Sequence, residues 1–199
     1  MATMAEKVRE LRDKTGAGVM DCKEALAATQ EDVEQAVDYL RKKGLASAAK
    51  RAHRQARDGA VGTYVHAGAK LGVLIEVNCE TDFVARTEPF QELIKSLAMQ
   101  VAAANPGYVA REDVPADVIE REKDIYRSQV ADQKKPPPVV EKIIEGKLGK
   151  YYEDTCLMEQ AYIRDSSGKT RVRDLVSEVS ARTGEKIAVR RFARFQVGE

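Results

Sequence analysis

The sequence predicts an α+β fold in which a three-helix bundle precedes a core of a small antiparallel sheet packed with helices. Three observations support this. Apolar residues recur three times at helical spacing within the first 45 residues, alternate along residues 59–79, and return in a final segment, residues 187–197. We therefore expect a bundle over residues 1–45, a basic linker helix over 46–58 and an α+β core over 59–199 that ends in a strand.

The bundle is predicted from residues 4–14 and 33–44, each of which places its apolar residues on one helix face, with a second short helix expected over residues 19–28. Glycines follow the first helix, and Gly44 is expected to end the third, because glycine permits the left-handed exit from a helix. A bundle this small lies near the lower size limit for independent stability.

Residues 46–58 are rich in alanine and in basic side chains, which predicts a helix. Two interpretations remain open. The segment is a solvated linker, as one-sided charge runs usually are, or it contacts nucleic acid. The second would use Lys50, Arg51, Arg54 and Arg57. No aromatic residue lies among them to stack on bases, which favours the linker.

Residues 59–79 predict an antiparallel hairpin with one buried face and a turn over residues 67–70. The expected apolar positions are Val61 and Val65 on the first strand and Val73, Ile75, Val77 and Cys79 on the second. His66, near the tip, is expected to be an exposed strand-end residue.

Four further helices are expected, over residues 88–104, 116–132, 139–152 and 172–183. The second of them should turn Val118, Ile125 and Val130 inward. The run Lys134, Lys135, Pro136, Pro137 and Pro138 cannot lie inside a helix, so it is a stiff spacer or a helix start. Gly184 should end the last helix.

The final segment, residues 187–197, is predicted to complete the sheet. Its paired arginines, Arg190 and Arg191, interrupt the alternation as a bulge would. An edge strand that also carries Arg194 and two phenylalanines is a place where a second subunit could pair.

Charge is concentrated where the predicted hairpin meets the next helix: Glu80, Asp82, Arg86 and Glu88 surround Phe83. Two interpretations of Phe83 remain open at this stage. It fills the chain's own core, as phenylalanine usually does, or it is a wedge directed at another molecule.

The composition argues against several function classes. Lys and Arg number 33 against 32 Asp and Glu, a balance that is unusual for a protein whose main work is to neutralise phosphates. No apolar run approaches the length of a membrane span or a signal peptide. We therefore expect a cytoplasmic protein with no membrane contact, and we do not expect nucleic acid as its main partner.

No catalytic or metal motif stands out. Cys22, Cys79 and Cys156 are far apart and only two histidines exist, so we expect reduced, mostly buried thiols, no metal site and no cofactor. Gly168-Lys169-Thr170 resembles the end of a phosphate-binding loop, but Ile163 stands where that loop needs glycine. A hydrolase with an unrecognised carboxylate site is a weak alternative. A binding protein, not an enzyme, is the expectation.

Three blocks of the sequence resemble the translation elongation factor Ts family. They are Thr-Gly-Ala-Gly-Val-Met-Asp-Cys-Lys-Glu-Ala-Leu from residue 15, Val-Asn-Cys-Glu-Thr-Asp-Phe-Val-Ala from residue 77, and the closing Arg-Phe…Phe-Gln-Val from residue 191. The resemblance covers essentially the whole chain. It implies a ubiquitin-associated-like N-terminal bundle, an α+β core, and guanine-nucleotide exchange on elongation factor Tu·GDP, with GDP released by disturbing the Mg²⁺ and phosphate site.

The resemblance also implies which residues act. Dislocation of the partner's Mg²⁺ falls on Thr81, Asp82, Phe83 and Val84, which favours the wedge interpretation of Phe83. The grip on the partner's GTPase domain falls on Val19, Met20 and Lys23. Longer family members carry two copies of the core subdomain, whereas this chain has room for one. Either one copy suffices or two chains supply the pair, and we expect a homodimer formed through the C-terminal strand region.

Overall fold

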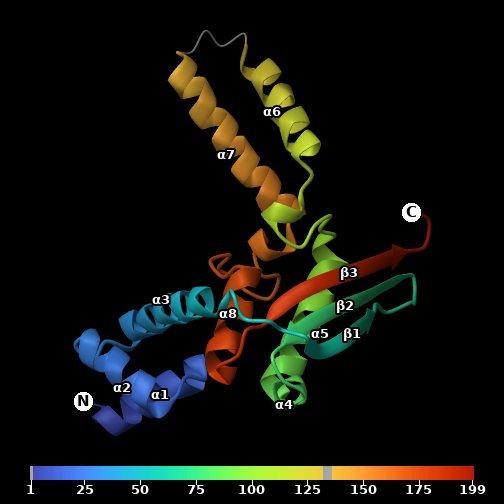
Figure 1. The fold of residues 1–199 in the computed structure, drawn as a ribbon. Coiled ribbons are helices and arrows are strands. Elements are labelled where there is room, and N and C mark those ends of the chain that lie inside the picture. The colour runs from blue at the N-terminus through green and yellow to red at the C-terminus, as the bar shows by residue number, and fades with distance from the viewer. Residues whose placement is uncertain (1, 132–135) are drawn as a thin grey trace. The chain divides into compact units, whose positions relative to one another are not determined.

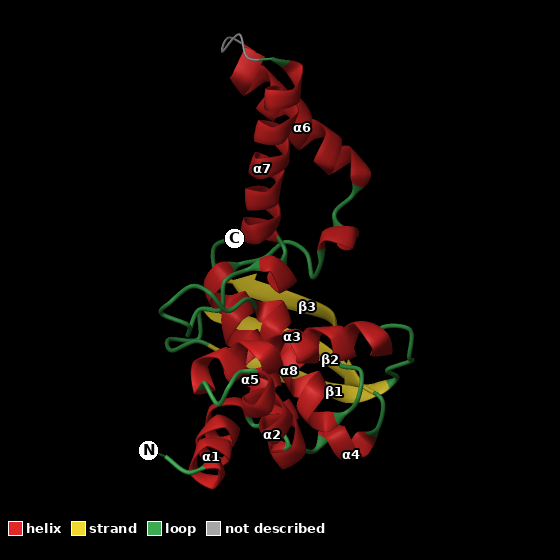
Figure 2. Ribbon diagram, turned by 90° about the vertical axis from the view of Figure 1, so that its left-hand side faces the viewer, coloured by secondary structure: helices red, strands yellow, loops and turns green. Residues whose placement is uncertain are grey.

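The computed structural model describes residues 2–131 and 136–199, apart from the side chains of residues 45, 48 and 49. It confirms the α+β class (Figures 1 and 2). The spacer expected at Lys134 and Lys135, and the end of the helix expected at residue 132, lie outside the described residues. The elements are α1 (Met4–Thr15), α2 (Val19–Ala28), α3 (Val33–Arg51), β1 (Asp58–Val65), β2 (Leu71–Cys79), α4 (Asp82–Ala85), α5 (Glu88–Ala104), α6 (Ala116–Val130), α7 (Pro137–Thr155), α8 (Val172–Thr183) and β3 (Ala188–Gln196), with short 3₁₀ turns at Arg111–Asp113 and Leu157–Glu159.

The chain divides into two compact units. The first comprises residues up to 61 together with 76–94 and 174–189, and the second comprises 62–75, 95–173 and 190–199. The first unit holds the bundle and the segment around Phe83. The second holds the α6–α7 pair and most of β3. Whether residues 1–45 form a domain of their own stays a prediction.

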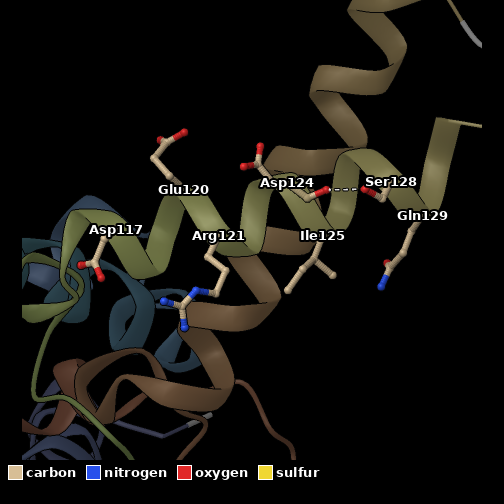
Figure 3. A pocket seen from close by; sticks show the side chains of 7 residues that line it. All are labelled: Asp117, Glu120, Arg121, Asp124, Ile125, Ser128 and Gln129. Carbon is tan, nitrogen blue, oxygen red and sulfur yellow. Dashed lines mark hydrogen bonds between the residues drawn. The ribbon is translucent and has the colours of Figure 1, made fainter.

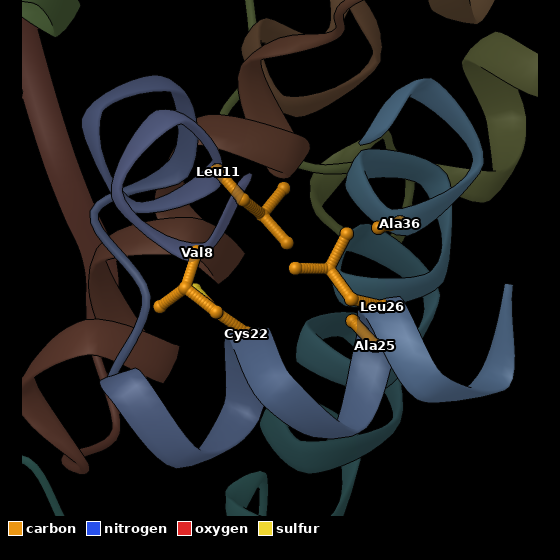
Figure 4. Close-up of a cluster of buried hydrophobic side chains, with 6 residues drawn as sticks. All are labelled: Val8, Leu11, Cys22, Ala25, Leu26 and Ala36. Carbon is orange, nitrogen blue, oxygen red and sulfur yellow. The ribbon is translucent and has the colours of Figure 1, made fainter. Parts of the chain in front are cut away.

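Helices α1, α2 and α3 form the expected bundle (Figure 4). Their facing sides bury one apolar cluster: Val8, Leu11, Cys22, Ala25, Leu26 and Ala36. A capping box between Thr3 and Glu6 starts α1, and Gly16, at φ +66°, ends it in the left-handed conformation. The local signals in the sequence and the packing of the helices therefore agree in this region.

The third helix differs from the prediction. Helix α3 passes through Gly44 and ends at Arg51, so residues 46–51 are its last turns, and no separate basic helix spans 46–58. A glycine weakens a helix interior by only about 1 kcal/mol relative to alanine, and the alanine-rich stretch that follows has high helix propensity. The stop predicted at Gly44 was wrong for that reason.

The sheet has the order β1-β2-β3 and is antiparallel. On β2 the predicted face is confirmed, because Val73, Ile75, Val77 and Cys79 are all buried. On β1 the predicted face is wrong: Val61 and Val65 are exposed, and the half-buried positions on the other face are Gly62 and Tyr64. Alternation identifies two faces of a strand, but the pairing with β2 decides which one is covered.

Helices α6 and α7 lie side by side as a helical hairpin of the second unit (Figures 1 and 2). Val130 and Ile144 are buried between them, whereas Ile125, predicted to face inward, is exposed. Pro136 precedes the first residue of α7, so the proline run starts a helix, as one of the two expectations held. Gly184, at φ +74°, follows α8 and confirms the predicted stop.

Candidate partner-binding site

The charged junction around Phe83 contains a helix of four residues, α4, which the sequence did not predict. This helix begins directly after β2, with Thr81 as its N-cap. The Thr81 hydroxyl oxygen accepts a hydrogen bond from the backbone N–H of Val84 at 3.4 Å. The four residues with an implied role, Thr81, Asp82, Phe83 and Val84, therefore belong to one capped helical turn.

Side chains on either side of α4 hold its carbonyl groups. The Cys79 thiol donates to the Thr81 carbonyl oxygen at 3.1 Å. The Thr87 hydroxyl donates to the Val84 carbonyl oxygen at 2.8 Å, and the Gln91 amide donates to that of Ala85 at 2.6 Å. An isolated helix of four residues is unstable in water, so these bonds define its conformation.

Phe83 projects from this turn into solvent. It is 78% exposed, whereas Ala85 on the same helix is buried. This excludes the interpretation that Phe83 fills the chain's own core. Asp82 forms an ion pair with Arg86 at 2.9 Å.

Glu185, which follows α8, approaches α4 from a distant part of the sequence. Its carboxylate accepts three hydrogen bonds: from the backbone N–H of Glu80 at 3.0 Å, from the backbone N–H of Thr81 at 3.1 Å, and from the Thr81 hydroxyl at 2.6 Å. Glu185 was not predicted from the sequence, because no local pattern marks a contact over 104 residues.

Glu80 is in turn hydrogen-bonded to Lys186, the residue that follows Glu185. The Glu80 carboxylate accepts from the backbone N–H of Lys186 at 2.6 Å and from the Arg54 guanidinium at 3.3 Å, and these bonds hold the pKa of Glu80 below its usual range, the backbone bond contributing most. The Lys186 ammonium donates to the carbonyl oxygens of Ala52 and Arg54, just beyond α3. Three segments of the first unit are thus tied together behind α4.

These contacts bear on the basic segment. Arg54 pairs with Glu80, and the Arg51 guanidinium donates to the Ser180 carbonyl oxygen at 3.3 Å. Two of the four basic residues considered for nucleic acid thus bond within the chain.

The second implied group lies at the start of α2, after Gly18. Met20 is 74% exposed, and Val19 and Lys23 are also exposed. Val19 and Lys23 are one helical turn apart and share a face. The group thus places an exposed apolar surface beside a positive charge.

A shallow hollow elsewhere coincides with neither group (Figure 3). Its lining residues all belong to α6: Asp117, Glu120, Arg121, Asp124, Ile125, Ser128 and Gln129. Within residues 2–131 and 136–199, no cluster of His, Cys, Asp and Glu side chains is arranged to hold a metal ion. No helix in the same ranges is long and apolar enough to cross a membrane.

Comparison with known proteins accounts for the whole chain. The family model described as elongation factor TS matches residues 2–199. The elongation factor Ts of Geobacter sulfurreducens is 57% identical over all of this chain and 91% of that protein. That of Caldanaerobacter subterraneus subsp. tengcongensis is 55% identical over 98% of this chain and 96% of its own length, and that of Thermodesulfovibrio yellowstonii is 53% identical over 100% and 98%. The chain therefore belongs to the elongation factor Ts family.

Proposed function

We propose that this protein, a factor of translation elongation by its family, is the guanine-nucleotide exchange factor of elongation factor Tu. It binds elongation factor Tu·GDP in the cytoplasm and promotes GDP release by disturbing the Mg²⁺ and phosphate site. It acts by binding, without making or breaking covalent bonds. The observation that supports the proposal best is Phe83, an aromatic side chain held in solvent on a capped turn within the family's motif.

The physical basis is linkage between two ligands of one GTPase. A GTPase holds GDP through backbone donors, a lysine and a Mg²⁺ ion that bridges phosphate oxygens. A factor that binds the nucleotide-free state more tightly than the GDP state must weaken GDP by the same ratio by which GDP weakens the factor. Exchange therefore requires contacts that the partner offers only after the metal site is disturbed.

Phe83 fits that requirement in this proposal. It enters between apolar elements of the partner's GTPase domain and stabilises the conformation that has lost the metal. Asp82 competes for polar groups near the metal loop, while Thr81 and Val84 complete the turn. The grip at Val19, Met20 and Lys23 supplies affinity that does not depend on the nucleotide.

The test is the rate at which a fluorescent GDP analogue leaves purified elongation factor Tu, with and without a catalytic amount of the chain. We expect a large acceleration, lost in Phe83→Ala without a change in melting temperature. Ile163→Ala is the matched control, because Ile163 is also an exposed apolar residue but belongs to neither implied group. If the wild-type chain does not accelerate GDP release, the proposed function is refuted. If Phe83→Ala accelerates GDP release as much as the wild-type chain does, the wedge role of Phe83 is refuted.

We also propose a homodimer through the C-terminal strand region. The backbone N–H of His66 donates to Leu71, and that of Val197 donates to Lys70, which sets the registers of both strands against β2. Val65 and Phe195 then flank Gly72 on the face of the sheet opposite the buried residues of β2. Val65 is 65% and Phe195 69% exposed, and a side chain added at Gly72 would meet nothing within 4 Å.

A second copy fits this surface because a twofold axis pairs one patch with itself, so an apolar sheet face can cover its own symmetry mate. Sedimentation equilibrium at micromolar concentration should show a dimer. Phe195→Glu should shift it to monomer, whereas Ile163→Glu, on an exposed apolar residue outside the sheet, should not. A wild-type monomer at that concentration would refute the proposal.

A further inference from the structure

We propose that Glu185 is a positioning residue of the exchange site: it completes the N-terminal cap of α4 from 104 residues away and thereby sets the direction in which Phe83 is presented. The inference rests on the proposed function, since it concerns how the same turn is held. Nothing in the family motif itself, which ends at Ala85, includes this residue.

The cap of α1 shows what an ordinary capping box does in this chain. The backbone N–H and the hydroxyl of Thr3 both donate to the Glu6 carboxylate, at 2.7 and 3.0 Å, while the Thr3 hydroxyl oxygen accepts from the Glu6 N–H at 3.3 Å. The glutamate three residues after the cap thus accepts from both donors of the threonine, and the threonine hydroxyl accepts from a backbone N–H of the first helical turn.

The cap of α4 repeats these three bonds with one substitution. The backbone N–H and the hydroxyl of Thr81 donate to Glu185, and the hydroxyl oxygen accepts from the residue three positions on. That residue is Val84, whose side chain has no acceptor. Glu185 therefore takes the role that a glutamate at position 84 would have, and Val84 leaves an apolar residue there.

The carboxylate also orients the Thr81 hydroxyl. A hydroxyl has one proton to donate, and the bond to Glu185 at 2.6 Å uses it. A lone pair of the same oxygen then faces the N–H of Val84, which starts the helical turn. Without Glu185 the hydroxyl is free to rotate, and the backbone N–H groups of Glu80 and Thr81 lose their acceptor.

The support of the turn extends through further hydrogen bonds to Lys186 and to the residues after α3. The Glu80 carboxylate accepts from the backbone N–H of Lys186, and the Glu185 carboxylate accepts from the backbone N–H of Glu80. Reciprocal hydrogen bonds therefore join the segment before α4 to the segment after α8. Lys186 in turn donates to the carbonyl oxygens of Ala52 and Arg54, just beyond α3. Phe83, 78% exposed, depends on this base for its direction, because its own side chain is barely packed.

The experiment compares Glu185→Ala, Phe83→Ala and the double variant in the GDP-release assay, with kcat and KM measured separately. Glu185→Ala should lower kcat/KM by about tenfold, the factor that one hydrogen bond to a charged group is worth, chiefly through kcat. The double variant should release GDP no more slowly than Phe83→Ala, because Glu185 acts only through Phe83 and its removal has no further effect once Phe83 is absent.

Asp165→Ala is the matched control. Asp165 likewise accepts from two backbone N–H groups and one hydroxyl, those of Ser167 and Thr170, in a turn of the second unit. It should leave exchange unchanged. Glu185→Gln keeps one carbonyl oxygen for the two amides, so it should lose only about two- to threefold, and it serves in place of Glu185→Ala if that variant fails to fold.

Amide hydrogen exchange on the chain alone gives a readout that does not involve the partner. Protection of the Thr81 and Val84 N–H groups should fall in Glu185→Ala and persist in Asp165→Ala. Losses that multiply in the double variant, or normal exchange activity in Glu185→Ala while Phe83→Ala is slow, would overturn the inference and leave the proposed function standing. Failure of the wild-type chain to accelerate GDP release would instead overturn the proposed function.

Discussion

Replacement of Glu159 by glutamine tests how the α6–α7 hairpin is held at its base. The Glu159 carboxylate accepts from the Arg111 guanidinium at 2.6 Å and from that of Arg173 at 2.9 Å, with its side chain only 11% exposed. Arg111 precedes α6 and also lies 5.0 Å above the ring of Tyr152 in α7. One carboxylate therefore joins the segments before and after the hairpin.

The magnitude follows from how well the arginines can recover. An ion left unpaired in a fully buried site costs about 3–5 kcal/mol, whereas a surface ion pair contributes about 0–1 kcal/mol. Arg111 and Arg173 are each 45% exposed, so water can solvate both once the carboxylate is gone. We expect Glu159→Gln to lower the free energy of unfolding by about 2 kcal/mol, between these limits.

Urea denaturation at pH 7 measures this loss, and an unchanged slope shows that the unfolded state is the same. Glu120→Gln is the control, because Glu120 is 60% exposed in its ion pair with Lys123 and should cost less than about 0.5 kcal/mol. A Glu159→Gln loss no larger than that of the control would refute the reasoning.

The pH dependence gives an independent check. Burial alone raises the pKa of Glu159, but the hydrogen bond from Arg111 and the charge of Arg173 outweigh it, so the folded pKa lies below the ordinary 4.5. The stabilisation is then complete above pH 4.5 and is lost as the pH falls through the folded pKa. The difference between wild type and Glu159→Gln should therefore narrow in acid, and a constant difference would contradict the assignment.

Three further predictions follow from single residues. A Cβ at Gly59, where φ is +147°, would lie 2.2 Å from the Val77 carbonyl oxygen, so Gly59→Ala should lower the free energy of unfolding in urea by more than about 2 kcal/mol; a neutral result would contradict the close approach. Burial raises the pKa of the Cys79 thiol to about 11, so it should react with a disulfide reagent far more slowly in the native protein than in urea, and equal rates would contradict its burial. Met20→Ala should weaken calorimetric binding to elongation factor Tu at least about fivefold without lowering the melting temperature, and unchanged affinity would remove Met20 from the proposed grip.

The sequence predicted most of the fold because the period of apolar residues survives in each element. The bundle, the hairpin, α5, α8 and the final strand all stand where that period placed them. The errors arose where a local signal competes with packing. Gly44 permits a helix to end but does not require it, and α3 continues through it. The valines of β1 face outward because the register with β2, not the composition of the strand, decides which face is covered.

The position of the candidate site could be predicted from the sequence, but the residues that hold its turn in place could not. The residues at 81–84 came from a resemblance, and periodicity alone left Phe83 between core and surface. The residues that hold the turn were beyond sequence reasoning, because Glu185 and Lys186 reach Thr81 and Glu80 across more than a hundred residues. No periodic pattern or fixed spacing in the sequence marks such contacts.

The way α4 is held bears directly on what Phe83 can do. Hydrogen bonds with Cys79, Glu185 and Gln91 hold the turn. Ala85 is the one residue of α4 that is buried, so the turn is held without burying a large apolar side chain. Phe83 thus keeps its apolar surface for a partner. Full burial of a phenylalanine is worth about 1.5–3 kcal/mol, and coupling between two ligands is typically about 1–3 kcal/mol. A phenylalanine already packed in its own core would have no such free energy to contribute. The hydrogen bonds that hold the turn without Phe83 therefore leave its apolar surface available for the exchange mechanism proposed above.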